Sequence, residues 1–587
     1  MLSKLQIVLV ALMAFIAIAH STTLTASPSV LKTSGDDVTI TWKDVTTPSE
    51  DDVIAIYYPV DSDITSPIGY VKMTTSSTWA KGFGSVTVPL VNTRAEYNFR
   101  VWVPGTKAPT MKVAGKTLEL AATSNGVNFE NPNAPGKVYL AHCNYTSEMR
   151  VVWISGSDDT PYVYVGNSPS NITTKFTGDS FTYSIGDMCD APANDPKYFK
   201  DPGYFHDVKL EHLEENTEYF YYVGSEKDGN SQVYSFISSP YVGSEAYFIA
   251  FGDLGVNTPF IAATSDMQTP APKTVANIYQ TITAPFSNSP LAQKLGKKPT
   301  NGLNTPPSWS ILHIGDISYA RGYAFIWDYF QEYMTEIASR APYMVTIGNH
   351  EYDFPKQPFK PSWSDFNTDS GGECGVPFSK RYHMTGAEGT PQRNVYYSYN
   401  NGPVHVTVMS MEHDFLVGSL QYQWLEEDLK NVDRSATPWV VFTGHRPMYD
   451  SARPGGAIGM MEHLQSDIEP LLVKYDVNMC LWGHVHVYER MCGMVKGECA
   501  KSDNDAPVHV LIGMAGNTYQ TVWNGDDINS QGEGHEDQPS YSVFRAINYG
   551  YTRFYANTTD LYFEFVGNNR NIVHDNFWLK SKYSINQ

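Results

Sequence analysis

The chain has 587 residues, of which 42% are hydrophobic and 18% are charged, and its formal net charge is −21. This length exceeds what one hydrophobic core normally serves, so we expect two to four domains. The hydrophobic content excludes a disordered chain. The acidic charge argues against nucleic acid or an anionic membrane surface as a partner.

The first residues have the pattern of a signal peptide. Lys4 precedes an apolar run from Leu5 to Ala19, and the small residues Ala19 and Ser21 stand at the expected cleavage positions. We therefore expect a signal peptide at residues 1–21 and a protein that is secreted or delivered to a lysosome or vacuole. A membrane anchor is the alternative, although the run is short for a membrane span.

Three sequons fit an exported protein and are the expected glycosylation sites: Asn144, Asn171 and Asn557. The six cysteines do not follow the spacing of a zinc site. Cys492 and Cys499 are close enough in sequence to close a small disulfide loop. Cys143 and Cys189 are a candidate pair in the N-terminal half, and Cys480 lies in an apolar run typical of a buried thiol.

Residues 22 to about 240 are predicted to be all β. Runs of β-branched and aromatic residues recur between turn residues. These runs are Asp37–Trp42, Val53–Tyr58, Tyr97–Trp102, Arg150–Trp153, Tyr162–Val165 and Thr217–Val223. The turn-rich stretch Asn131–Gly136 separates two groups of runs. We expect two β-sandwiches, the second similar to a fibronectin type III domain.

After residue 244, short apolar strands alternate with helical patterns, which is typical of an α/β domain. Two sets of apolar residues recur at helical spacing: Ile326, Phe330, Tyr333 and Ile337, and then Leu425, Leu429 and Val432. The stretch 265–307 is rich in Pro, Asn, Thr and Lys. It is interpreted as a surface insertion with one short helix.

Five apolar strands each run into a glycine that adjoins residues able to bind a metal. The five segments are Gly252-Asp253, Gly315-Asp316 with Tyr319, Gly348-Asn349-His350, Gly444-His445 and Gly483-His484-Val485-His486. In α/β sheets, ligands gather at the carboxyl ends of the strands. Asp, Asn and His supply the oxygen and nitrogen donors that metal ions prefer. The pattern predicts a metal site where these strand ends meet.

The order Asp, Asp-x-x-Tyr, Asn-His, His, His-x-His over about residues 245–570 closely resembles the purple acid phosphatase family of the calcineurin-like metallophosphoesterases. Three longer runs resemble its large plant-type members: Gly315–Tyr323, Ile347–Pro355 and Gly444–Tyr449. The resemblance implies an α/β metallophosphoesterase domain at 245–500, with its C-terminal part at 501–587. A β-sandwich at 22–132 and the fibronectin type III-like N-terminal domain of the family at 133–240 would precede it.

The resemblance also implies the ligands of two metal ions. The first ion would be bound by Asp253, Asp316, Tyr319 and His486, and the second by Asp316, Asn349, His445 and His484. A phenolate from Tyr319 favours Fe(III), and the partner ion would be divalent Zn, Mn or Fe. A tyrosine that only packs beside two ordinary divalent ions is the alternative. A Ser/Thr protein phosphatase fits less well, because Ala320 and Arg321 stand where that family has Asp-Arg-Gly.

The function implied is that of an acid phosphatase, which hydrolyses phosphate monoesters with hydroxide bound to the metal pair. His350 resembles the family's outer histidine, which protonates the leaving group or holds the phosphate. Asn349 and Arg446 are candidate substrate contacts. The smaller family members have a further substrate-side histidine where this chain has Pro454. Candidate replacements for it are Arg446, Tyr449 and Arg453.

Two other functions stay open at this point. One is a phosphodiesterase or nucleotide-sugar hydrolase of the same family, and the other is a non-catalytic binding or adhesion protein built on the β-sandwiches. The expected partner is a small phosphate-ester substrate, without nucleic acid or membrane, and a homodimer is left open. His463, in a helical pattern, and His535, in a loop, receive no role.

Overall fold

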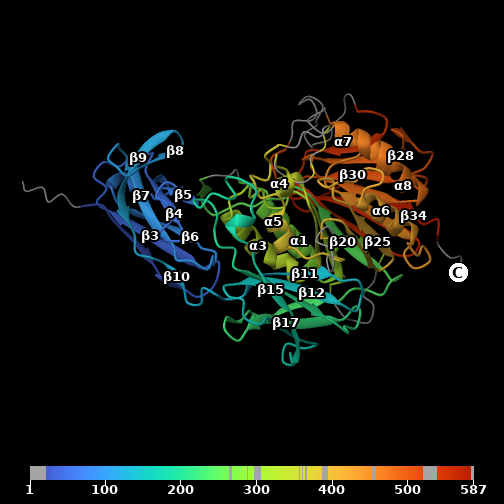
Figure 1. Ribbon diagram of the computed structural model, residues 1–587, viewed down its shortest axis with the longest axis horizontal. Coiled ribbons are helices and arrows are strands. Elements are labelled where there is room, and N and C mark those ends of the chain that lie inside the picture. Colours follow the sequence, from blue (N-terminus) through green and yellow to red (C-terminus); the bar gives the residue numbers. More distant parts are fainter. Residues whose placement is uncertain are drawn as a thin grey trace, which may run out of the picture. The chain divides into compact units, whose positions relative to one another are not determined.

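The computed structural model describes residues 21–263, 267–286, 289–296, 306–355, 357, 359, 361, 363, 367–386, 394–452, 458–519 and 538–583 (Figure 1). The predicted signal peptide, apart from its last residue, lies outside these residues, and so do Arg453, Pro454 and His535. The chain divides into two compact units. The first comprises Met1–Glu130 with Pro259–Ala263, and the second comprises Asn131–Thr258 with Thr264–Gln587.

The first unit is a β-sandwich. In β3, Val38, Ile40 and Trp42 are fully buried and alternate with more exposed residues, as one inward face of a strand requires. A three-stranded sheet has the order β1-β3-β6, a six-stranded sheet has the order β21-β5-β4-β7-β9-β8, and β10 pairs with β2. The bounds are β1 (Thr23–Ser27), β2 (Val30–Leu31), β3 (Asp37–Lys43), β4 (Val53–Tyr57), β5 (Gly69–Lys72), β6 (Gly84–Pro89), β7 (Asn98–Pro104), β8 (Thr110–Val113), β9 (Lys116–Thr123), β10 (Asn128–Phe129) and β21 (Ile261–Ala262).

The second unit begins with another β-sandwich, whose core contains Trp153 and Tyr221. One sheet has the order β11-β12-β16-β15, and the other has the order β14-β13-β17-β18 with β19 also paired to β17. All six strand runs predicted from the sequence are confirmed, in β3, β4, β7, β12, β13 and β17. The bounds are β11 (Gly136–His142), β12 (Met149–Ser155), β13 (Tyr162–Gly166), β14 (Thr174–Thr177), β15 (Asp179–Phe181), β16 (Tyr204–Leu210), β17 (Glu218–Ser225), β18 (Gly229–Asn230) and β19 (Tyr234–Ile237).

The rest of the second unit is built on two sheets. The first has the order β23-β22-β20-β32-β33-β34, and the second has the order β24-β25-β26-β27-β30-β28-β29 with β31 also paired to β28. The central strands β20, β22 and β23 are parallel, as are β25, β26, β27 and β30. The bounds are β20 (Ala246–Phe251), β22 (Trp309–Ile314), β23 (Tyr343–Thr346), β24 (Tyr397–Asn401), β25 (Val404–Val408), β26 (Trp439–Gly444), β27 (Met479–Trp482), β28 (Tyr488–Val495), β29 (Glu498–Cys499), β30 (Val508–Ile512), β31 (Ser542–Ala546), β32 (Gly550–Ala556), β33 (Asp560–Gly567) and β34 (Val573–Lys580).

Helices flank these sheets, and none of the described helices is long and apolar enough to cross a membrane. The bounds are α1 (Ala271–Thr283), α2 (Pro290–Lys294), α3 (Phe325–Ala338), α4 (Asn349–Tyr352), α5 (Val376–Arg381), α6 (Leu420–Lys430), α7 (Ile458–His463) and α8 (Glu469–Lys474), with a π-helical turn at Leu464–Ile468. The predicted apolar faces are confirmed in α3, where Phe330 and Ile337 are fully buried, and in α6, where Leu425 is fully buried.

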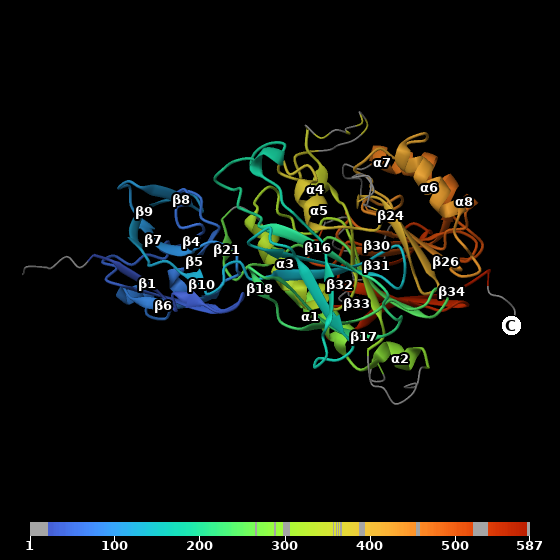
Figure 2. The same cartoon turned by 60° about the horizontal axis from the view of Figure 1, so that its bottom comes forward.

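The prediction of one short helix within residues 265–307 is wrong. The described part of this stretch contains α2 and the thirteen-residue α1, which packs against α3 (Figure 2). Val275 and Ile278 are buried on the inner face of α1. The many Pro, Asn and Thr residues of the stretch hid this apolar spacing, which tertiary packing rather than helix propensity stabilises.

The cysteines pair differently from one of the two predictions. Cys492 and Cys499 form the predicted small loop, which connects β28 and β29. Cys189 bonds to Cys374, with Cα atoms 6.2 Å apart, so the suggested Cys143–Cys189 pair is wrong, and Cys143 is a buried free thiol. The error arose because the segment that carries Cys189 leaves its sandwich and contacts Gly371 and Gly372, distant in sequence. Cys480 is a buried free thiol, as predicted.

The predicted glycosylation sites differ in exposure. Asn144 and Asn171 are exposed, whereas Asn557 is half-buried and its side-chain amide donates a hydrogen bond to the Tyr555 hydroxyl at 3.1 Å. Glycosylation at all three positions stays a prediction, and the two exposed asparagines are the more accessible acceptors.

Asp207 in β16 links the second sandwich to the α/β part of the unit. Its carboxylate accepts hydrogen bonds from Arg150 of β12, at 2.5 Å, and from the His383 ring. Burial by itself would raise the pKa of Asp207, but the hydrogen bonds and charges of His383 and Arg150 hold it below its usual value. A carboxyl group with a depressed pKa stabilises the fold when it is ionised.

We predict that Asp207→Asn lowers the free energy of unfolding by about 3–5 kcal/mol near neutral pH, because the buried guanidinium of Arg150 loses the negative charge of Asp207. Asp207 contributes its full stability above the pKa of an unfolded aspartate, about 3.9, and loses it as the pH falls through the lower folded value. Urea denaturation at several pH values measures the effect. Asp37→Asn, which is exposed at the start of β3 in the first unit, is the control. If Asp207→Asn lowered the free energy of unfolding by the same amount at pH 3 as near neutral pH, the result would contradict this account.

A candidate metal centre at the strand ends

The structure brings together all seven of the residues predicted to bind metal. They follow the carboxyl ends of β20, β22 and β23 in one sheet and of β26 and β27 in the other. The seven are Asp253, Asp316, Tyr319, Asn349, His445, His484 and His486, and all are buried except His484, which is half-buried. The edges of two sheets therefore supply one cluster of donors.

The backbone is unusual at four of these residues. Asp253, Asp316, Tyr319 and His484 have φ values of 59°, 50°, 53° and 68°. This left-handed conformation costs a residue with a side chain about 1–2 kcal/mol and is found where the surrounding structure enforces it, often at functional sites. The turns aim the side chains inward immediately after each strand.

The first group of donors surrounds the Tyr319 hydroxyl. It lies 3.2 Å from Asp253 Oδ1, 3.2 Å from His486 Nε2 and 3.4 Å from Asp316 Oδ2. His486 Nε2 lies 3.3 Å from Asp253 Oδ1. Ligand atoms of the three residues other than the tyrosine lie within 4.8 Å of one another. These four side chains can surround one ion.

The second group surrounds the Asn349 carbonyl oxygen, Oδ1. It lies 3.0 Å from His445 Nε2 and 3.0 Å from His484 Nδ1. His445 Nε2 is also 3.2 Å from Asp316 Oδ1. Asp316 thus turns one carboxylate oxygen toward each group, so this carboxylate would be able to contact two ions.

The donor chemistry of both groups fits a cation. His445 Nδ1 faces the Ile314 carbonyl at 2.9 Å, and His486 Nδ1 faces the Thr518 carbonyl at 2.8 Å. A carbonyl only accepts, so each neutral ring carries its proton on Nδ1 and turns the lone pair of Nε2 into the site. Lone pairs of nitrogen and oxygen then face one another, and a metal ion would satisfy them.

Without a metal ion, a proton on His445 reduces the repulsion between these facing lone pairs. Burial would lower the pKa of His445, but the negative charge of Asp316 and its hydrogen bond raise it to about 10. Asp316 has a pKa well below its usual value, although burial opposes this, chiefly because of the positive charge of His445. Metal binding to this pair must therefore release a proton.

Glu351 links the turns that follow β22 and β23 through hydrogen bonds. Its carboxylate accepts backbone hydrogen bonds from Asp316 at 3.0 Å, Ile317 at 2.8 Å and Gly348 at 3.0 Å. Gly348 is needed here, because a side chain would meet Asp316 Oδ1 at 2.4 Å. Burial, and next the charge of Asp316, raise the pKa of Glu351 to about 8. Sequence reasoning missed this role, although Glu351 lies in the quoted Ile347–Pro355 run.

His350 lies at the edge of the donor cluster. Its Nε2 is 3.8 Å from Asp316 Oδ2, its ring centre is 4.6 Å from that of Tyr319, and its Nδ1 is 3.1 Å from the Asp369 main-chain oxygen. Burial lowers the pKa of His350, and the nearby Arg321 adds to this effect, whereas Asp316 opposes it. The ring is close to both donor groups without belonging to either.

Arg446 is enclosed by carboxylates. Its Nε donates to Glu412 at 2.9 Å, its Nη2 donates to Asp353 at 2.7 Å, and its Nη1 lies 3.4 Å from His484 Nε2. Burial, and next the positive charge of Arg446, hold the pKa of His484 well below its usual value. The neutral imidazole that results is the form that binds metal.

The remaining residues considered from the sequence lie away from the donors. The Tyr449 hydroxyl donates to Glu469 at 2.7 Å and accepts from the Gly497 amide. His463, at the end of α7, packs on the Trp363 ring with centres 4.4 Å apart. Among the described residues, neither contacts any of the seven donors, and Arg446 is the substrate-side candidate nearest to them.

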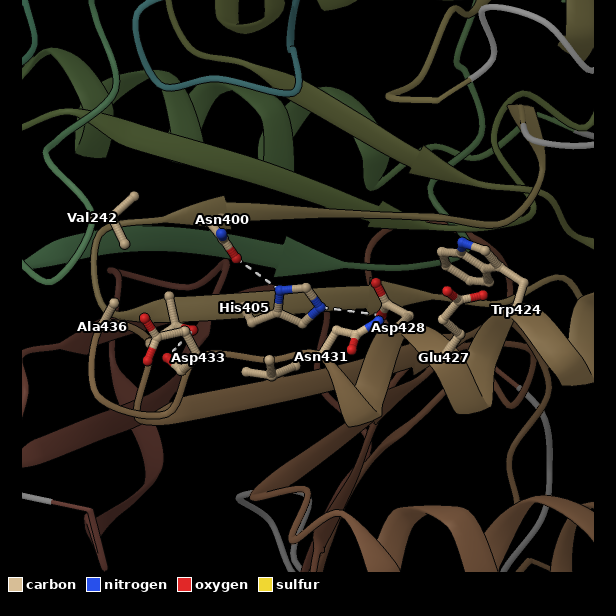
Figure 3. A pocket seen from close by; sticks show the side chains of 11 residues that line it. Val242, Asn400, His405, Trp424, Glu427, Asp428, Asn431, Asp433 and Ala436 are labelled. Atoms are coloured by element: carbon tan, nitrogen blue, oxygen red, sulfur yellow. Dashed lines mark hydrogen bonds and ion pairs between the residues drawn. The ribbon is translucent and has the colours of Figure 1, made fainter.

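A polar hollow of about 560 Å³ lies beside β25 and α6 (Figure 3). His405 is buried in it, with Nδ1 2.7 Å from Asn400 Oδ1 and Nε2 3.1 Å from Asp428 Oδ2. Asp428 also accepts from Ser398 and Thr407. None of the seven donors lines this hollow, and the polar groups of its histidine are paired, so it adds nothing to the metal centre.

Three protein-family models together match most of the chain. Residues 135–238 match the model of the purple acid phosphatase N-terminal domain, residues 261–488 match the calcineurin-like phosphoesterase model, and residues 506–576 match the iron/zinc purple acid phosphatase-like protein C model.

Three similar proteins illustrate the match. An Arabidopsis thaliana protein named "Probable inactive purple acid phosphatase 9" is 38% identical over 94% of this chain and 85% of its own length. A "Nucleotide pyrophosphatase/phosphodiesterase" of Hordeum vulgare is 34% identical over 46% of this chain and 72% of its own length. The structure of a purple acid phosphatase from yellow lupin (Lupinus luteus) seeds covers 96% of both chains, with a TM-score of 0.79 and 28% identity.

Proposed function

The chain belongs to the purple acid phosphatase family, and from that premise we propose that it is an acid phosphatase that hydrolyses phosphate monoesters at a two-metal centre. The observation that carries the proposal is the placement of Asp316 between two groups of donors. Asp253, Tyr319 and His486 would complete the first metal site, and Asn349, His445 and His484 the second.

The donor set supports Fe(III) in the first site and a divalent ion in the second. Burial, and next the charges of Asp253 and Asp316, raise the pKa of Tyr319 well above its usual value. A strongly polarising ion is therefore needed to form the phenolate. When bound, the pair of ions would hold the phosphate oxygens and lower the pKa of bound water.

The chain's own residues would orient the substrate and move one proton. His350 Nε2 faces the donor cluster, while its Nδ1 faces a main-chain oxygen. When protonated, Nε2 can donate to the oxygen of the leaving group, which makes His350 the general acid. Arg446 holds His484 neutral beside the second site, so its contribution to substrate binding would act through that histidine.

The word "inactive" in the name of the Arabidopsis relative describes that protein. In this chain all seven donors converge, which supports activity, whereas Pro454 replaces the substrate-side histidine of the smaller family members. Two disulfides support export, because disulfides persist in oxidising compartments. We propose that the chain is secreted or vacuolar, with a signal peptide at residues 1–21.

The bridging role of Asp316 gives the first functional prediction. Asp316→Asn should lose both metals and essentially all phosphatase activity, because the bridge loses its negative charge. Asp253→Asn should deplete mainly the first metal, together with the visible absorption that arises from Tyr319 and Fe(III). His445→Ala should deplete mainly the second. Elemental analysis, a visible spectrum and activity on a phosphate monoester measure these outcomes for each variant.

Tyr319→Phe provides the matched test of iron, because it removes only the hydroxyl. Its visible band should disappear while the fold stays intact. A colourless, iron-free protein with full activity would disprove the iron assignment. If Asp316→Asn keeps two metals and normal turnover, the bridged arrangement is wrong.

The proposed proton donor is tested separately. His350→Ala should keep both metals and lower turnover by about 10²–10⁴-fold, the usual contribution of a general acid. The loss should be smallest for esters whose leaving groups need no proton, such as nitrophenyl phosphate. Rates for a series of leaving groups measure this dependence. An equal loss across the series would assign His350 to substrate positioning, and His463→Ala, distant from the donors, is the control.

A second candidate function, hydrolysis of diesters or diphosphates, is favoured by Arg321. Its guanidinium lies over the Tyr319 ring, 5.6 Å from the ring centre, and its buried Nε has no hydrogen-bond partner in the structure. No described carboxylate forms an ion pair with Arg321, in contrast to Arg446. Its backbone is left-handed, with φ 52°. Such a cation beside His350 suits a substrate that carries a second anionic group.

We predict that Arg321→Gln lowers kcat/KM for a nucleoside diphosphate by about 10–100-fold, the equivalent of one charged hydrogen bond. The value for a monoester without a second charge should change far less. Steady-state kinetics on both substrates measure the ratio. Lys430→Gln, at the end of α6, removes a distant exposed charge as the control. Equal losses on both substrates would eliminate Arg321 as the specificity residue.

A further inference from the structure

Asn349 can serve the second donor group only with its carbonyl oxygen turned inward. An asparagine side chain rotated by half a turn would present an amide group there, which cannot bind a metal. In the structure Oδ1 lies 3.0 Å from both His445 Nε2 and His484 Nδ1. Some other residue must therefore hold the amide nitrogen on the far side.

Asp369 does this. The Nδ2 of Asn349 donates a hydrogen bond to Asp369 Oδ2 at 3.0 Å. A carboxylate accepts but does not donate, so only the orientation with Oδ1 toward the histidines satisfies this contact. Asp369 lies 20 residues from Asn349 in the chain and outside every segment that the sequence pattern selected.

Asp369 also orients the side chain of His350, the residue after Asn349. The main-chain oxygen of Asp369 lies 3.1 Å from His350 Nδ1. Because this oxygen only accepts, Nδ1 of His350 carries a proton, and Nε2 remains the atom that faces Asp316. Asp369 thus orients two adjacent residues through two different atoms.

The loop that carries Asp369 is braced from the preceding β-sandwich. The amides of Cys189 and Ala193 donate to the carbonyls of Gly372, at 2.9 Å, and Gly371, at 3.1 Å. The Cys189–Cys374 disulfide joins the same two segments covalently. Within the loop, Ser370 donates its amide to the Asp353 carbonyl at 3.0 Å. These contacts restrict movement of the loop on the C-terminal side of Asp369.

We infer that Asp369 is a positioning residue of the metal centre, which fixes the Asn349 carbonyl toward the second metal and the His350 ring toward the substrate, and that the disulfide-linked β-sandwich segment holds it in place. This inference rests on the proposed function, in which Asn349 binds the second metal. Its chemistry is orientation alone, because Asp369 contacts Asn349 Nδ2 and His350 Nδ1 rather than the atoms that would bind metal.

Equilibrium dialysis with Zn²⁺ against protein that retains Fe(III) is the direct test. Asp369→Leu should weaken Zn²⁺ binding at the second site by about 10–100-fold, the usual cost of removing a group that orients a metal ligand. The visible band of the first site should persist. Asp369→Asn should restore most of the affinity, because its Oδ1 can still accept from Asn349. Thr368→Ala, an exposed neighbour, is the matched control.

The outcomes separate the two levels of the proposal. If the wild-type protein binds no second metal, the proposed function itself fails. If it binds Zn²⁺ and Asp369→Leu binds equally well, the positioning role is wrong. Equal losses in Asp369→Leu and Asp369→Asn, together with a lower thermal midpoint, would show a general structural role instead and would also overturn the inference.

The role of the Cys189–Cys374 disulfide in holding this loop is tested separately. A double variant, Cys189→Ser with Cys374→Ser, should weaken Zn²⁺ binding in the same direction as Asp369→Leu, with the smaller size expected for a loop that keeps its backbone hydrogen bonds. Cys492→Ser with Cys499→Ser removes the other disulfide as the control and should leave Zn²⁺ affinity unchanged. Unchanged affinity in the Cys189 and Cys374 variant would refute the bracing role.

Discussion

The carboxylate of Asp316 is the group on which the site depends. It is almost fully buried and directs one oxygen to each of two donor groups, so every other donor is arranged around it. A buried carboxylate is stable only when it is paired. Here His445 and the His350 backbone amide support it in the chain alone, and a pair of cations would do so in the loaded protein.

This constraint explains why the surrounding backbone is so tightly specified. Four donors adopt left-handed conformations, and Glu351 fastens the turns after β22 and β23 by accepting three backbone amides. Each turn places a side chain immediately at the end of a buried strand. The cost of the strained turns is offset by the sheets that hold them, and the site lies where the edges of both sheets meet.

The positive charges around the site differ in their surroundings. Arg446 is held by Glu412 and Asp353 and acts on His484, whereas Arg321 lies over the Tyr319 ring without a described carboxylate partner. An arginine already held by carboxylates has little capacity left for a substrate, while one without them retains it. The preceding β-sandwich contributes through the segment around Cys189, which contacts the loop of Asp369. The sandwich is thus part of the support of the site.

Local pattern was sufficient for the strands and for the segments that carry the donors. Runs of β-branched and aromatic residues predicted β3, β4, β7, β12, β13 and β17, the glycines after five buried strands marked the donor segments, and the resemblance to the family selected the seven donors within them. These signals are local because a strand buries its side chains with a period of two and because strand ends need a sharp turn. The sequence by itself therefore determined the classes of the domains and which side chains converge.

Only the tertiary structure decided that Cys189 bonds Cys374, that α1 packs against α3, and that Asp369, Glu351 and Arg321 adjoin the donors. Those contacts join segments far apart in the chain or depend on the direction of one side chain. A repeating pattern of apolar residues predicts neither of these features.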